Sequence, residues 1–184
     1  RLDIARHWAE THPWKPRERP SQMSRDAFVL KFGGIYEHSP WVAERVHRAE
    51  MGAVHDSARG LARRMAQIFR SADDQARLDV LRAHPDLAGK LAAAKKLTAE
   101  STSEQASAGL DSLTDAERAE FTRLNDAYVA RHGFPFIIAV RDYDKPGIQA
   151  AMRARVDNNT ETERAEAEKQ VMRIAELRLK DLLP

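Results

Sequence analysis

Apolar residues recur at three- and four-residue steps in almost every periodic segment of this chain. Between residues 53 and 69 the apolar positions are seven, four and three residues apart, which keeps them on one face of a helix. These positions are Val54, Leu61, Met65 and Ile68. Only residues 136–140 depart from the pattern, as an apolar run that is either an extended segment or the buried start of another element. The spacing therefore predicts an all-α fold, a single-domain bundle of about eight helices.

Residues that start or stop helices divide this pattern. Ser39 followed by Pro40 is typical of an N-cap with proline at the first helical position. Ser71 is predicted to cap a further helix that runs to about Ala83. Pro85 stops that helix, because proline disfavours helical geometry in the residue before it.

Two capping boxes mark later helices. Thr114–Glu117 is predicted to open a helix that ends at Gly133. Thr160–Glu163 has the same pattern and is predicted to open the last helix, which runs to about Leu183.

The first 22 residues differ in composition from the rest. Residues 15–20 contain two prolines and four charged residues in six positions, which disfavours regular structure. We therefore expect residues 1–22 to form an N-terminal extension or linker and residues 23–184 to form the globular domain. Residues 1–8 resemble the C-terminal end of a polysaccharide-deacetylase-like allantoinase, which suggests the tail of a fused allantoinase domain. An unrelated extension, vector-derived or particular to this protein, explains residues 1–22 equally well.

The charge pattern argues against a nucleic-acid partner. The chain has 30 Lys and Arg against 28 Asp and Glu, and the two signs are interleaved along the predicted last helix. A nucleic-acid binder would gather its basic residues on one face. No run is long and apolar enough for a membrane span, and no signal peptide is visible. We therefore expect a soluble cytoplasmic protein with neither a nucleic-acid nor a membrane partner.

The sequence offers few routes to cofactor chemistry. Its lack of cysteine excludes disulfides, thiolate catalysis and Cys-ligated zinc. It has no His-Glu-x-x-His motif, no phosphate-binding glycine loop and no nucleophile elbow. We predict neither a metal site nor a cofactor, so any catalysis has to come from ordinary side chains.

His84 is the most suggestive of the seven histidines. It directly precedes Pro85, which places it on a turn at the end of a helix, where a scaffold can present a functional group. An imidazole with a pKa of about 6.5 can take or give a proton near neutral pH. Asp86 either orients the ring or caps the next helix, and the cap is the better interpretation. On these residues alone, a structural and a catalytic role for His84 are equally supported.

A second candidate segment contains a carboxylate and an amide. Ser101–Glu104 fits a capping box, and the residues alone favour a helix start over a functional role for Glu104. The neighbouring Gln105 carries an amide that both donates and accepts hydrogen bonds, as recognition of a ureido or lactam group requires.

Two further segments could meet a ligand. The apolar residues 136–140 are more often core than contacts, yet a non-helical segment leaves backbone N–H and C=O groups that need partners. Arg178 is centred on the apolar stripe of the last helix, and Arg155 has a similar place one helix earlier. A buried arginine needs either a carboxylate partner or an anionic ligand, and periodicity does not choose between them.

These segments, taken in order, resemble the OHCU decarboxylase family, which converts 2-oxo-4-hydroxy-4-carboxy-5-ureidoimidazoline (OHCU) to S-allantoin in urate breakdown. The resemblance runs from about Phe28 to Leu183, and Val156 stands where the family commonly has leucine. The segments are 34–41, 84–89, 101–105, 133–138, 155–158 and 178–179.

The resemblance implies an all-helical homodimer that uses no cofactor and acts on a small ureidoimidazoline. It implies a catalytic role for His84, as the acid, and for Glu104 and Arg178. The substrate-binding residues that it implies are Pro85, Ser101, Gln105, Phe136, Ile137, Ile138, Ala139 and Val140. The residues also allow a non-catalytic helical interaction module, or a basic nucleic-acid binder, which the interleaved charges argue against.

Overall fold

The computed structural model describes residues 18–88 and 97–184, and these form one all-α unit without strands. The prediction of an all-α fold with about eight helices is confirmed. The eight α-helices of the described residues are α2 (Arg25–Phe32), α3 (Trp41–Arg48), α4 (Ala58–Arg70), α5 (Asp74–Ala83), α7 (Ala99–Ser107), α8 (Asp115–His132), α9 (Lys145–Arg155) and α10 (Thr160–Leu182). Three short 3-10 helices accompany them, η1 (Pro20–Gln22), η2 (Ala53–Asp56) and η3 (Val140–Asp142).

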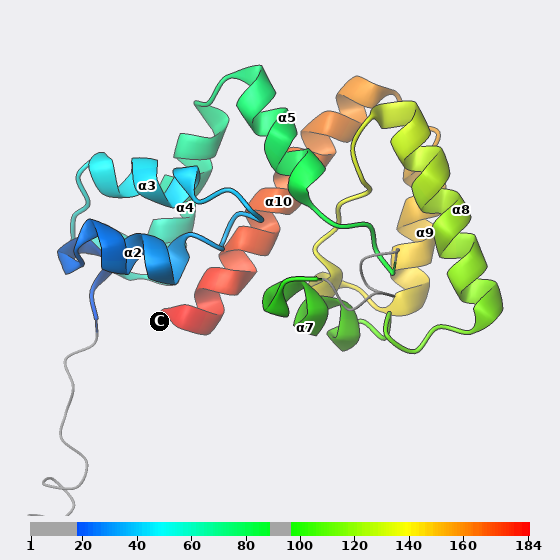
Figure 1. Ribbon diagram of the computed structural model, residues 1–184, viewed down its shortest axis with the longest axis horizontal. Coiled ribbons are helices and arrows are strands. Elements are labelled where there is room, and N and C mark those ends of the chain that lie inside the picture. Colours follow the sequence, from blue (N-terminus) through cyan, green and yellow to red (C-terminus); the bar gives the residue numbers. More distant parts are fainter. Residues whose placement is uncertain (1–17, 89–96) are drawn as a thin grey trace, which may run out of the picture.

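Helix α10 is the central helix of the molecule. It runs diagonally between α2, α3 and α4 on one side and α7, α8 and α9 on the other (Figure 1). Its buried positions are spaced for one broad face, as amphipathic helices require. They include Ala167, Val171, Ile174, Ala175, Arg178 and Leu179. Arg178 is thus held among apolar neighbours at the junction of the two groups of helices.

Several predicted helix ends are confirmed. Thr114 and Glu117 form the capping box of α8, and Gly133 ends that helix in the left-handed region with φ of 77°. Glycine adopts that conformation without the clash that a Cβ would cause. Helix α5 ends at Ala83 and α10 ends at Leu182, close to the predicted positions.

Other predicted helix starts were wrong, because a nearby residue caps instead. Helix α5 is capped by Asp73, whereas Ser71 follows the end of α4. Pro40 is the N-cap residue of α3, and the Ser39 hydroxyl donates to the Glu37 carbonyl instead of capping. Asn159 caps α10, so Thr160–Glu163 is not a capping box.

The single helix predicted over 53–69 is also wrong. Its first part is the separate turn η2, and α4 begins at Ala58 behind the cap Ser57. Val54 is consequently exposed, while Leu61 and Met65 lie in the core.

The described part of the predicted linker packs on the domain. The backbone N–H and hydroxyl of Ser21 both donate to the Asp56 carboxylate, at 2.8 and 3.0 Å. Glu18 pairs with Lys31 of α2 at 2.9 Å. Residues 1–17, which include the stretch that resembles an allantoinase, lie outside the described residues. Among the helices that are described, none combines the length and apolarity needed to cross a bilayer.

Candidate active site

A pocket between α5, α7 and α10 brings most of the predicted site residues together. The segment 136–140 closes one side of it. The residues that line the pocket are His84, Pro85, Leu87, Ser101, Glu104, Gln105, Phe136, Ile137, Ile138, Val140, Ile174 and Arg178. Ten of these residues were predicted from the sequence; Leu87 and Ile174 were not, and the predicted Ala139 does not line it. Its walls are mostly apolar, and five polar side chains converge on it from α7, α10 and the end of α5.

The ring of His84 is fixed by one nitrogen. His84 is half-buried just after α5, in an extended conformation before Pro85, and its Nδ1 lies 2.9 Å from the Val80 carbonyl oxygen. A carbonyl only accepts, so Nδ1 carries the proton and the neutral ring has its lone pair on Nε2.

Burial lowers the pKa of His84 below its ordinary value, and the charge of Arg178 lowers it further. The hydrogen bond to Val80 and the charge of Glu37 oppose this shift without overcoming it. The ring is therefore neutral near pH 7, with Nε2 able to accept a proton.

The turn that follows His84 is held from two sides. The Gln105 side-chain oxygen accepts from the Ala88 N–H at 2.9 Å, and the Asn125 amide donates to the Leu87 carbonyl at 2.8 Å. Ala88 has a φ of 50°, a strained conformation for a residue with a Cβ. Its oxygen is engaged, and within 18–88 and 97–184 the Nε2 amide group of Gln105 makes no hydrogen bond, so it can donate to a ligand.

Glu104 is not part of a helix cap. Helix α7 begins at Ala99 and is capped by the Thr98 hydroxyl, so the interpretation of Ser101–Glu104 as a capping box was wrong. Ser101 and Glu104 instead lie one turn apart inside the helix, which places their side chains on the same face. Both line the pocket.

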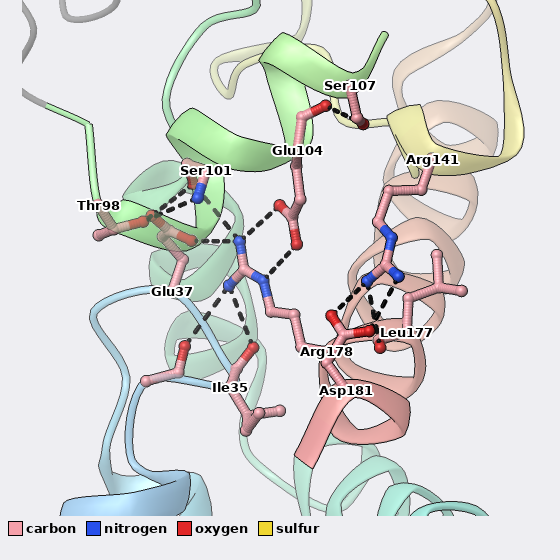
Figure 2. Close-up of polar contacts among 11 residues, drawn as sticks. Ile35, Glu37, Thr98, Ser101, Glu104, Ser107, Arg141, Leu177, Arg178 and Asp181 are labelled. Carbon is pink, nitrogen blue, oxygen red and sulfur yellow. Dashed lines mark hydrogen bonds and ion pairs between the residues drawn. The ribbon is translucent and has the colours of Figure 1, made fainter.

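Arg178 connects three parts of the chain. Its guanidinium lies between two carboxylates, and Figure 2 shows the dashed contacts that surround it. Nε and Nη2 bind the two Glu104 oxygens at 2.8 and 2.9 Å, and Nη2 also lies 2.9 Å from Glu37. Nη1 makes longer contacts to the carbonyls of Ile35 and Gly34, at 3.3 and 3.5 Å. The side chain is 5% exposed, so this is a buried and fully engaged arginine.

Glu37 is a buried residue that sequence reasoning missed. One of its oxygens accepts from the Thr98 and Ser101 hydroxyls at 2.9 and 3.0 Å, and the other faces Arg178. Burial alone would raise the pKa of Glu37, but Arg178 and these hydrogen bonds hold it below the ordinary value. A lone glutamate before His38 has no periodic or spacing signal. Only its place within the segment 34–41 could have drawn attention to it.

Arg155 has a structural partner and does not line the pocket. Its guanidinium pairs with Glu163 at 3.0 Å, and its Nη1 donates to the Ile137 carbonyl at 3.1 Å. Tyr128 and Asn158 also donate to Glu163, at 2.6 and 2.7 Å. This buried network lies behind the segment 136–140 and supports it.

The segment 136–140 is extended and irregular before it enters η3. Its Ala139 N–H donates to the Gln170 side chain at 2.9 Å. The N–H groups of Ile137 and Ile138 make no hydrogen bond within 18–88 and 97–184. Both residues line the pocket, so their backbone donors are available to a ligand rich in carbonyl groups.

Comparison with known proteins places this pocket in a known family. The sequence profile of the OHCU decarboxylases matches residues 21–180, most of the chain. The chain belongs to the OHCU decarboxylase family. The OHCU decarboxylase of Haloferax volcanii is 43% identical over 162 residues, which cover 88% of this chain and 92% of that protein.

Two further relatives are longer chains, and this chain matches only a part of each. The crystal structure of an (S)-allantoin synthase superposes with a TM-score of 0.69 at 33% identity, and covers 89% of this chain and 52% of that one. The uric acid degradation bifunctional protein PucL of Bacillus subtilis is 37% identical over 89% of this chain but only 32% of its own length. The OHCU decarboxylase fold thus occurs both alone and joined to other sequence.

Proposed function

We propose that this chain decarboxylates 2-oxo-4-hydroxy-4-carboxy-5-ureidoimidazoline and protonates the product on one face to give S-allantoin. The observation that carries the proposal is the pocket itself, where Nε2 of a neutral His84 lies among apolar walls with Glu104 and Gln105. Membership of the OHCU decarboxylase family identifies the substrate class.

The substrate supplies its own electron sink. Its name places the carboxylate and a hydroxyl on C4 and leaves a C5=N1 double bond beside them. When the bond from C4 to the carboxylate breaks, its electron pair forms C4=C5, and the C5=N1 pair moves to N1, which takes a proton from the medium. Carbon dioxide leaves, and the remaining enol carries its hydroxyl on C4. The protein therefore needs to bind the substrate, exclude water from the reacting carbons and move protons.

We assign the proton transfer to His84. Because the ring is neutral at rest, Nε2 first accepts the proton of the C4 hydroxyl, whose electron pair then forms the C4 carbonyl. The C4=C5 pair takes a proton at C5 from the same imidazolium. A single donor fixed on one side of the ring produces one configuration at C5.

The other pocket residues bind and orient the substrate in this proposal. Glu104, held by Arg178, accepts hydrogen bonds from the N–H groups of the ureidoimidazoline. The side-chain amide NH2 of Gln105 and the backbone N–H groups of Ile137 and Ile138 donate hydrogen bonds to the carbonyls of the substrate. Apolar walls favour loss of the charged carboxylate as neutral carbon dioxide. Arg178 contacts the substrate only by exchanging one of its present partners, so we assign it mainly to holding Glu104.

Freshly prepared substrate provides the direct test. It decays spontaneously to racemic allantoin, so the chain should both accelerate its loss and give S-allantoin in excess, followed by circular dichroism at a wavelength where allantoin absorbs. An unchanged rate with racemic product would exclude the proposal and favour a non-catalytic interaction module.

We also propose that the protein is a homodimer, as the family resemblance implies. Sedimentation equilibrium should give twice the chain mass of 20.8 kDa, and a mass of one chain would exclude it. We place the protein in the cytoplasm, where fractionation of its native host should find it.

We also propose a fusion or association with an allantoinase through residues 1–22, since relatives exist that match this chain over only part of their own length. Intact mass of the protein in its native host decides, since a chain that starts near Met23 would exclude the fusion.

A further inference from the structure

Glu37 lies behind the pocket, where it binds α7 and α10, two of the elements that carry the site. It comes from the loop between α2 and α3, it binds two hydroxyls at the start of α7, and it faces Arg178 of α10. Its side chain is 1% exposed and does not line the pocket. The chain turns sharply directly after it, at His38, whose φ is 48°. The Ser39 hydroxyl closes that turn on the Glu37 carbonyl at 2.9 Å.

A buried carboxylate is costly unless its charge is compensated. Arg178 carries one positive charge, whereas Glu37 and Glu104 carry two negative charges between them. With His84 neutral, the cluster therefore has one negative charge in excess. Among the described residues, the charges of these four side chains balance when His84 carries a proton, and the proposed mechanism forms that state in each turnover.

Several titratable side chains surround His84. Glu37 and His38 face it from the α2–α3 loop, Glu104 from α7 and Arg178 from α10. Residues 136–140 bring only apolar side chains to the pocket. Glu104 is bound on both oxygens by Arg178, whereas Glu37 shares that arginine through one oxygen only. Glu37 is thus the carboxylate whose charge Arg178 neutralises least.

We infer that Glu37 is a positioning residue that fixes Arg178 and supplies the counter-charge for the imidazolium of His84. This inference rests on the proposed decarboxylase function. It assigns to a residue outside the pocket an electrostatic part in the proton transfer.

The substitution Glu37→Gln tests the role because it keeps the shape and removes the charge. Without that charge the protonated ring is less stable, so the pKa of His84 falls. The pH at which kcat/KM is half-maximal, on the limb that rises with pH, should then move to lower pH. We expect kcat to fall at least about tenfold, since one pKa unit corresponds to a tenfold change in the protonation equilibrium.

Two comparison variants separate this role from simple support of the fold. Glu37→Asp keeps the charge, so it should keep the wild-type pH midpoint while losing part of kcat through its shorter reach. Glu168→Gln removes a carboxylate that is 13% exposed and pairs with Arg77 at 3.0 Å, away from the pocket. It should change neither the midpoint nor kcat.

The outcomes distinguish the two proposals. A wild-type chain without stereospecific turnover would contradict the decarboxylase function itself. An active wild type with an unshifted pH midpoint in Glu37→Gln would overturn only the role of Glu37, whatever happens to kcat. If Glu37→Gln loses its helical circular dichroism, Glu37→Asp decides: a lower kcat at an unchanged midpoint supports the role, and a wild-type kcat overturns it.

Discussion

His84 is held through Nδ1, and this leaves Nε2 as its reactive atom. The hydrogen bond to the Val80 carbonyl fixes both the tautomer and the direction of the ring. The sequence showed that Pro85 places this histidine on a turn, but not that its own preceding helical turn would orient it. The hydrogen bond to Val80 and the pocket around the ring favour a catalytic role for His84 over a structural one.

The substitution His84→Asn should remove proton transfer without disturbing the fold. General acid–base groups contribute about 10²–10⁴-fold to rate, so turnover should fall by about that factor and the enantiomeric excess of S-allantoin should decrease. Helical circular dichroism should remain unchanged. His55→Asn is a matched control, because His55 lies outside the pocket and accepts from the Gly52 N–H at 2.9 Å. Stereospecific turnover at the wild-type rate in His84→Asn would exclude His84 from the mechanism.

Single residues were predicted unevenly from the sequence. Glu104 matched a capping box, and only the competing Thr98 cap shows that its carboxylate is free to face Arg178. Arg178 was recognised because its place on an apolar stripe is unusual for a charge. Glu37 was missed because one buried glutamate in a loop has no periodic neighbour, and its burial depends on contacts with residues 61 to 141 positions away.

At the scale of elements, the segment 136–140 shows that helical periodicity does not predict what holds a non-helical segment in place. The absence of helical spacing there was visible in the sequence, and the structure confirms an irregular path. What holds that path was not predictable, because Arg155 and Gln170 reach it from two other helices. Helix starts were misplaced by one to three residues wherever two capping residues compete, as Asp73 does with Ser71.

The substitution Arg155→Met should lower the free energy of unfolding. It leaves the Glu163 carboxylate buried without its positive partner, and breaking a buried pair in this way costs about 3–5 kcal/mol. Urea unfolding measures the loss. The double substitution Arg155→Met with Glu163→Gln should recover part of it, because no unpaired charge remains.

A matched exposed pair calibrates that measurement. Arg153 and Glu120 lie 2.6 Å apart, but their side chains are 54% and 29% exposed. Arg153→Met should therefore cost less than about 1 kcal/mol. If Arg155→Met cost no more than Arg153→Met, the buried network would have no special part in holding the segment 136–140.

For the whole molecule, two histidines and two glutamates that are buried or half-buried share one dependence on pH. Burial lowers the pKa of both His84 and His132 below the ordinary histidine value. Glu37 and Glu163 have lowered pKa values because their arginine and hydroxyl partners outweigh the opposing effect of burial. All four groups therefore bind protons less readily in the folded chain than in the unfolded chain, and this makes the fold sensitive to acid.

The free energy of unfolding should consequently fall in two stages as the pH is lowered. The first stage begins near the unfolded histidine pKa of about 6.5, because His84 and His132 then bind protons in the unfolded chain but not in the folded chain. The second begins near the unfolded glutamate pKa of about 4.3 and continues down to the folded values. Urea unfolding at a series of pH values measures both stages. The double substitution His84→Asn with His132→Asn should remove the first stage and leave the second. A first stage that persists in the double variant would show that the two histidines are not held neutral by the fold, and the neutral resting state proposed for His84 would then be wrong.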